Sequence, residues 1–248
     1  MLQPETEPPA VAPDPSDAAQ RLVALTEVVL CSDFVTQIAV GGALAALGVA
    51  PYVKGTTRLS VSYVVALSLG DAALLIGLML IILRAHGQSP RRIFLGKRPV
   101  IGEALLGVPL TFMAFGIAAA VLLSVLRFAP SLHTVADNPL QSMLTTPRDA
   151  WLFALVLVVA GGVREEMQRA FLLDRFERWL GGARLGVLII SIGFGAGHLT
   201  QGVDATIATG LLGAFWAVIY LWRRSCVAPM VSHTAFDLLQ ILQFLVRR

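Results

Sequence analysis

The chain has 248 residues, of which 56% are hydrophobic and only 14% are charged, and its formal net charge is +3. Its mean hydropathy is +0.75, whereas an ordinary soluble domain is roughly 45–50% apolar and about 25% charged. This composition excludes a typical cytosolic enzyme, a disordered regulator and a disulfide-rich secreted domain, and it indicates a polytopic membrane protein.

Residues 1–20 are rich in proline and acidic side chains, contain no Lys or Arg, and show no apolar periodicity. They lack the basic start and the short apolar core of a signal peptide, which predicts a retained, flexible acidic tail. We expect residues 21–248 to form a single membrane domain.

The rest of the chain divides into apolar runs of about the 20 residues that one helical crossing of a bilayer needs. The predicted spans cover residues 25–53, 60–83, 100–126, 150–173, 185–203, 204–222 and 227–246. Strands of a membrane β-barrel would be shorter and would alternate in polarity. The sequence therefore predicts an all-α, polytopic transmembrane bundle of about seven spans, with six or eight as the alternatives.

Basic residues are unevenly shared between the two predicted sides of this bundle. The loop 84–99 and the connections on its side hold Arg84, Arg91, Arg92, Lys97, Arg98, Arg175, Arg178, Arg184, Arg223 and Arg224; the opposite side holds Lys54, Arg58, Arg127, Arg148, Arg247 and Arg248. The excess of Lys and Arg predicts a cytoplasmic loop 84–99 and a cytoplasmic N-terminus, in the cytoplasmic membrane if the protein is bacterial. A basic face with polar surroundings is missing, so we expect no nucleic-acid partner.

Ionisable side chains gather in three segments of the C-terminal half, each in a different predicted helix: 161–172, 193–198 and 233–237. An ionisable group inside the bilayer costs about 2.5–3.5 kcal/mol on insertion scales and is by default a functional candidate. Glu165 and Arg169 are four residues apart and share a helix face, as do His233 and Asp237.

Two kinds of chemistry suit these side chains. A glutamate can act as a general base on water while histidines stabilise the developing oxyanion. Alternatively, His198, His233, Glu165 and Asp237 can bind a divalent metal such as zinc that activates the water. Both alternatives predict hydrolysis, and the residue types fit a glutamate-only mechanism and a metal-assisted mechanism equally well.

The three segments resemble the motifs of the CPBP family of intramembrane proteases, which includes the CAAX prenyl endopeptidases and proteins linked to bacteriocin immunity. The family pattern is a Glu-Glu pair followed by Arg, then Phe-x-x-x-His, then His-x-x-x-Asn/Asp, each on a separate helix. Here the pattern falls on Glu165, Glu166 and Arg169, on Phe194 and His198, and on His233 and Asp237. The resemblance covers roughly residues 100–246.

The resemblance implies an intramembrane endopeptidase that cleaves a peptide bond in or near the bilayer, on a peptide or protein substrate whose lipidation is left open. It implies that Glu165 or Glu166 activates water, with His198 assisting. His233 and Asp237 would then position or stabilise the tetrahedral intermediate, while Arg169 and Phe194 orient the site.

Two departures from the family pattern affect the assignment of roles. Only two residues separate Glu166 from Arg169, where the family usually has three. We favour Glu165 as the base because it is four residues from Arg169, with Glu166 as the alternative. An ionised Asp237 can only accept hydrogen bonds, so it is better suited to orient His233 or to bind a metal than to donate to an oxyanion.

A non-catalytic membrane scaffold or immunity protein that retains the motif residues is the competing hypothesis, motivated by these departures. A transporter with a proton relay is disfavoured, because the charged groups lie in one half of the chain and no inverted repeat is visible.

A few residues outside the motifs carry expectations of their own. Asp71 lies in the middle of a predicted span and could pair with an arginine of the motif region. Cys31 and Cys226 do not have the sequence spacing of metal ligands, and we expect both to be small, buried side chains. His86 and His133 lie in predicted loops, and we expect both at the surface. The tryptophans fall mostly near span ends, as interfacial anchors do.

Overall fold

The computed structural model describes residues 15–135 and 139–246, and these residues form a bundle of helices without strands. An isolated bridge between Tyr52 and Leu59 closes the loop that connects the second and third helices. In chain order the elements are α1 (Pro15–Leu30), α2 (Phe34–Ala46), α3 (Val61–Ala85), α4 (Pro90–Phe94), α5 (Val100–Phe128), η1 (Pro130–Leu132), α6 (Pro139–Ser142), α7 (Pro147–Val156), η2 (Leu157–Arg164), α8 (Glu165–Trp179), α9 (Ala183–Ala196), η3 (Leu199–Gln201), α10 (Val203–Arg223) and α11 (Val227–Val246). The structure confirms the predicted all-α bundle.

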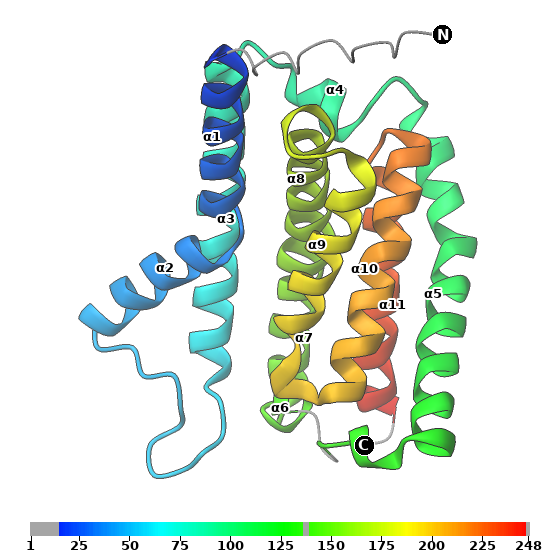
Figure 1. Ribbon diagram of the computed structural model, residues 1–248. Helices are drawn as coiled ribbons and strands as arrows, with labels where there is room; N and C mark the ends of the chain where they lie inside the picture. The colour runs from blue at the N-terminus through cyan, green and yellow to red at the C-terminus, as the bar shows by residue number, and fades with distance from the viewer. Residues whose placement is uncertain (1–14, 136–138, 247–248) are drawn as a thin grey trace, which may run out of the picture.

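The long elements run back and forth between two ends of the bundle (Figure 1). The pair α1–α2, α3, α5, the continuous segment α7–η2–α8, α9, α10 and α11 follow one another in alternating directions, in agreement with about seven spans. Helix α1 begins at the end that carries α4, and α11 ends at the opposite end. Residues 15–20 of the predicted tail already belong to α1, and residues 1–14 lie outside the described part of the chain.

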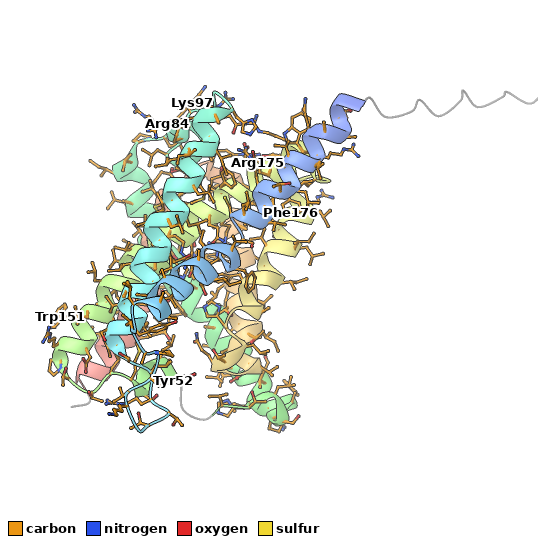
Figure 2. All side chains as sticks on the ribbon, turned by 90° about the vertical axis from the view of Figure 1, so that its left-hand side faces the viewer. Tyr52, Arg84, Lys97, Trp151, Arg175 and Phe176 are labelled. Carbon is orange, nitrogen blue, oxygen red and sulfur yellow. The ribbon has the colours of Figure 1, made fainter. Side chains whose placement is uncertain are left out.

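Three described helices, α3, α5 and α10, are by themselves long and apolar enough to cross a membrane. The outer face of α5 shows why: Ile101, Leu105, Val108 and Phe112 recur at helical spacing and are all exposed. Large apolar side chains on the outside of a helix are stable in lipid but not in water. Figure 2 shows Arg84 and Lys97 at one end of the molecule and Tyr52 and Trp151 at the other, as expected of the two membrane interfaces.

The first span is broken rather than straight. Helices α1 and α2 together pass the test for a crossing, but they meet at an angle of 42°. Asp33, in the break, has a φ of +80°, which a non-glycine residue rarely adopts. The predicted span 25–53 therefore starts and ends too late, because the helices cover 15–30 and 34–46.

The segment α7–η2–α8 widens into a π-helix at its centre. The Glu165 amide donates to the carbonyl of Ala160, five residues earlier, instead of the four residues of an α-helix. Gly161 and Gly162 lie in this stretch and have low helix propensity, which makes a departure from α-helical hydrogen bonding less costly. The widened turn lies directly before the predicted Glu-Glu pair.

Glycines allow close packing of helices at several contacts. A Cβ atom added to Gly162 would lie 1.7 Å from Thr234 Oγ1 of α11, and one added to Gly195 would lie 2.6 Å from a backbone carbonyl oxygen of α10. The neighbouring Gly193 has nothing within 4 Å of such an atom. The close approach of neighbouring helices therefore depends on particular glycines. Small residues generally allow such close packing in membrane bundles.

Candidate active site

The three predicted segments converge on one cavity of about 450 Å³. Glu165 begins α8, Phe194 lies in the last turn of α9 with His198 just beyond it, and His233 and Asp237 lie on α11. These five side chains all line the cavity.

His233 is the hub of the cluster. It is buried, and its Nδ1 atom donates to Glu166 Oε1 at 2.9 Å. On the other side of the ring, Nε2 lies 3.8 Å from Glu165 Oε2 and 3.6 Å from Asp237 Oδ2. The bond to Glu166 fixes the ring so that Nε2 is directed at two carboxylates.

Glu166, not Glu165, is the partner of Arg169. The Arg169 guanidinium pairs with Glu166 Oε1, three residues earlier, and both side chains are buried. The spacing of four residues that favoured Glu165 therefore does not correspond to an ion pair with Arg169. The physical reason is that Glu165 is directed into the cavity, where its side chain is 17% exposed, while Glu166 is directed into the protein.

Aromatic rings hold both histidines and the arginine in place. The Trp216 ring stacks on His233 with a centroid separation of 3.9 Å and an interplanar angle of 18°. The Phe194 ring packs edge-on against His198 at 4.9 Å and lies 4.8 Å from the Arg169 guanidinium carbon. His198 Nδ1 donates to the Phe194 carbonyl at 2.8 Å, so the motif spacing of four residues places the ring against its own helix end.

The Asp237 carboxylate packs directly against Gly161 of the π-helix. A Cβ atom at Gly161 would lie 2.9 Å from Asp237 Oδ2. Helix α11 can therefore approach η2 closely enough to bring His233 and Asp237 beside Glu165.

The metal alternative finds no ligand set among the side chains that the structure describes. No group of three or more His, Cys, Asp or Glu side chains is arranged there to hold a metal ion.

Residues 147–239 match the family model of the type II CAAX prenyl endopeptidases, Rce1-like. The match covers less than half of the chain, and this segment is similar to the Rce1-like family. The match agrees with the family resemblance of the motifs, and it supports a CAAX-type protease in general. Comparisons with curated proteins and with solved structures gave no match.

The Rce1-like segment begins with α7 and ends within α11, so it contains all seven predicted site residues. Two further acidic residues lie outside the Rce1-like segment but close to the site: Asp33 in the break of the first span, and Asp71 of α3. Both pair with Arg164, the residue directly before the Glu-Glu pair. Asp71 thus has the arginine partner in the motif region that the sequence suggested.

Trp216 is a residue whose role the sequence did not show. Its position late in a predicted span suggested an interfacial anchor, yet it is 1% exposed and packs under His233. Trp151 and Trp222 are exposed at 70% and 61%, as interfacial anchors are. Cys31 and Cys226 are buried free thiols, as predicted.

His86 and His133 lie at the surface, as predicted, but each pairs with a buried acid. His86 Nε2 lies 2.5 Å from Glu27, and His133 Nδ1 lies 2.7 Å from Asp204 at the start of α10. Asp204 also lines the cavity.

The cavity extends from the cluster toward the end of the bundle that carries α6 and η3. Apolar walls come from α5, α6, the α6–α7 connection and α7, through Leu122, Leu140, Leu144 and Phe153 in that order. The polar cluster therefore lies beside a mostly apolar channel, an arrangement suited to binding an extended apolar chain.

Proposed function

We propose that the protein is an intramembrane endopeptidase in which Glu165 activates the water that cleaves a peptide bond in or near the membrane. The observation that carries this proposal is the arrangement around His233. Its Nε2 atom faces Glu165 and Asp237 in the cavity, while Glu166 holds its other nitrogen.

The distances around Nε2 suit a bridging water. Separations of 3.6 and 3.8 Å to the two carboxylates are too long for direct hydrogen bonds, and polar contacts beyond about 3.5 Å are those that a water can bridge. Such a water has an acceptor, Glu165, for the proton that it must lose.

In the proposed reaction, Glu165 takes a proton from the water and the resulting hydroxide attacks the scissile carbonyl carbon. His233, protonated on both nitrogens, donates from Nε2 to the carbonyl oxygen as it becomes negative, and His198 assists from the facing wall. The C–N bond then breaks, and the proton held by Glu165 passes to the leaving amine. One water is consumed and no other reactant is needed.

Glu166 and Asp237 have supporting roles in this proposal. Glu166 is held by Arg169 and fixes the His233 ring through Nδ1. Asp237 accepts rather than donates when ionised, so it directs Nε2 of His233 and favours the protonated ring.

The apolar channel supports a lipidated peptide as the substrate. The description of the matched family names prenylated CAAX substrates, and a prenyl chain would lie against the walls formed by Leu122, Leu144 and Phe153. We propose that the substrate enters from the bilayer with its lipid in the channel and its scissile bond beside Glu165.

We also propose that the end of the bundle that carries α4 faces the cytoplasm. Arg84 and Lys97 lie at this end (Figure 2), Arg91 and Arg92 belong to α4 itself, and Arg98 directly follows Lys97. Cytoplasmic loops are enriched in such residues. Reaction of single introduced cysteines with an impermeant maleimide tests this orientation: a cysteine at residue 97 should be protected in intact cells, and labelling there would reverse the assignment.

The function is tested by cleavage of an internally quenched, prenylated CAAX peptide by the full-length protein in liposomes. Glu165→Gln, His198→Ala and His233→Ala should each lower kcat at least about 100-fold, as loss of a general base or an oxyanion donor does. Glu166→Gln should lower it less, because it disturbs only the orientation of His233. A wild-type protein that cleaves neither this peptide nor its unprenylated form would favour the non-catalytic scaffold instead.

Glu177→Gln is the matched control, since it makes the same substitution on the same helix. Glu177 pairs with Arg224 at the exposed end of α8, away from the cavity. This variant should cleave at the wild-type rate. Equal loss in Glu177→Gln and Glu165→Gln would show that the assay reports folding rather than chemistry.

A further inference from the structure

Arg164, the last residue of the π-helix, is a buried cation that the proposed reaction does not use. Its side chain is 7% exposed, and a charge within a membrane span is costly unless it is paired. Three carboxylates surround its guanidinium. The distances are 3.1 Å to Asp33 Oδ1, 3.7 Å to Asp71 Oδ2 and 3.8 Å to Glu165 Oε1.

The contacts on the far side of Arg164 dock the break of the first span onto the start of α8. Asp33 accepts from Gln37 Nε2 at 2.7 Å through its second oxygen. Gln168 donates to the Cys31 carbonyl at 2.8 Å and accepts from Arg164 Nη1 at 3.2 Å. Arg164 and Gln168 thus hold residues 31–33 in a conformation whose positive φ would otherwise be strained.

The near side of Arg164 holds the candidate base. Glu165 Oε1 faces Arg164, while its Oε2 faces His233 Nε2. Both contacts are 3.8 Å long, so they act by charge attraction or through a bridging water rather than by direct hydrogen bonds, and together they favour one orientation of the carboxylate. Reactions lose rate steeply when the reacting group is misplaced.

We infer that Arg164 is a positioning residue: it holds the Glu165 carboxylate toward His233 and, through Asp33 and Asp71, makes the first two spans part of the site. This inference rests on the proposed function of Glu165. It gives the first two spans a role in catalysis although they lie outside the Rce1-like segment.

A merely structural role for Arg164 would be to neutralise Asp71, which is 1% exposed. The double variant Arg164→Gln/Asp71→Asn separates the two roles, because it removes the cation together with the buried charge that needs it. If Arg164 positions Glu165, this variant should fold as well as the wild type and still lose kcat by about 10- to 100-fold, with KM changed less than about twofold. Arg164→Lys keeps the charge and should recover part of kcat.

Arg223→Gln is the matched control. Arg223 forms another ion pair with a buried acid, 2.5 Å from Glu103 at the opposite end of the bundle, and it does not line the cavity. It should lower the melting temperature in detergent and leave kcat unchanged. A double variant with wild-type kcat would overturn the inference.

Hydrogen exchange followed by mass spectrometry tests the docking without activity. Peptides that cover residues 30–37 should exchange faster in Arg164→Gln/Asp71→Asn than in the wild type or Arg223→Gln, because the break is no longer held. Unchanged exchange would overturn the inference even where kcat falls. If the wild type cleaves no peptide, the proposed function fails, and the exchange experiment alone then decides whether Arg164 docks the break.

Discussion

Gly162 is the position where one added methyl group should disturb the site most. It faces Thr234 of α11, the residue directly after His233. Gly162→Ala would place a Cβ atom 1.7 Å from Thr234 Oγ1, 3.0 Å from Thr234 Cβ and 3.3 Å from the Met230 carbonyl oxygen. Rotation of the threonine can move only the first of these atoms.

The remaining contacts set the size of the effect. Ordinary contacts between carbon atoms are about 3.5–4.0 Å, so the 3.0 Å contact with Thr234 Cβ requires α11 to retreat by about 0.5–1 Å. Overpacking of this kind typically costs about 1–3 kcal/mol of stability. Since His233 moves with α11, and a misplacement of about 1 Å can lower a rate roughly 100-fold, we expect a loss of kcat of about 10- to 100-fold.

The assay compares cleavage of the prenylated peptide and thermal unfolding in detergent for Gly162→Ala and Gly193→Ala. The control makes the same substitution on α9, where an added Cβ has nothing within 4 Å. Gly162→Ala/Thr234→Ala should recover part of the loss, because it removes the closest atom. The reasoning is refuted if Gly162→Ala and Gly193→Ala have the same melting temperature and rate.

Other substitutions test the packing around the site. Trp216→Phe keeps a ring under His233 but loses the 3.2 Å hydrogen bond from Nε1 to Ser232 Oγ; chemical unfolding should show a loss of about 1 kcal/mol, and a loss above about 3 kcal/mol would contradict this account. Glu27→Gln removes one of the two charged partners of buried Arg175, while Asp174 remains; it should cost about 1.5–3 kcal/mol, seen as a lower melting temperature with KM unchanged, and an unchanged melting temperature would contradict this. Gly195→Ala should separate α9 from α10 and cost about 1–3 kcal/mol; an unchanged melting temperature would show that the two helices can part freely.

The long spans could be predicted from the sequence because their length and composition are imposed by the bilayer. The runs 60–83 and 100–126 correspond to α3 and α5 within a few residues, since an apolar helix in lipid must satisfy its own backbone hydrogen bonds. The first span could not be predicted as well. Its break at Asp33 depends on contacts with Arg164 and Gln168, more than a hundred residues away.

The motifs could be found in sequence for a similar reason. The spacing of four residues between Phe194 and His198, and between His233 and Asp237, places each pair one helical turn apart. The same rule failed for Arg169, which pairs with Glu166 instead of Glu165. Helical spacing says which side chains share a face, but both glutamates lie within reach of Arg169, and neighbouring helices decide which one is directed into the cavity.

The sequence by itself determined that this is an α-helical membrane protein, and its three motifs predicted which polar side chains would be concentrated in its C-terminal half. These features follow from short-range physics: the thickness of the bilayer and the pitch of a helix. Only the tertiary structure decided that Glu165 lies in the cavity while Glu166 holds His233, that Trp216 supports the ring, and that Asp33 and Asp71 reach Arg164. These contacts depend on how closely the helices approach at Gly161 and Gly162, which no single helix specifies.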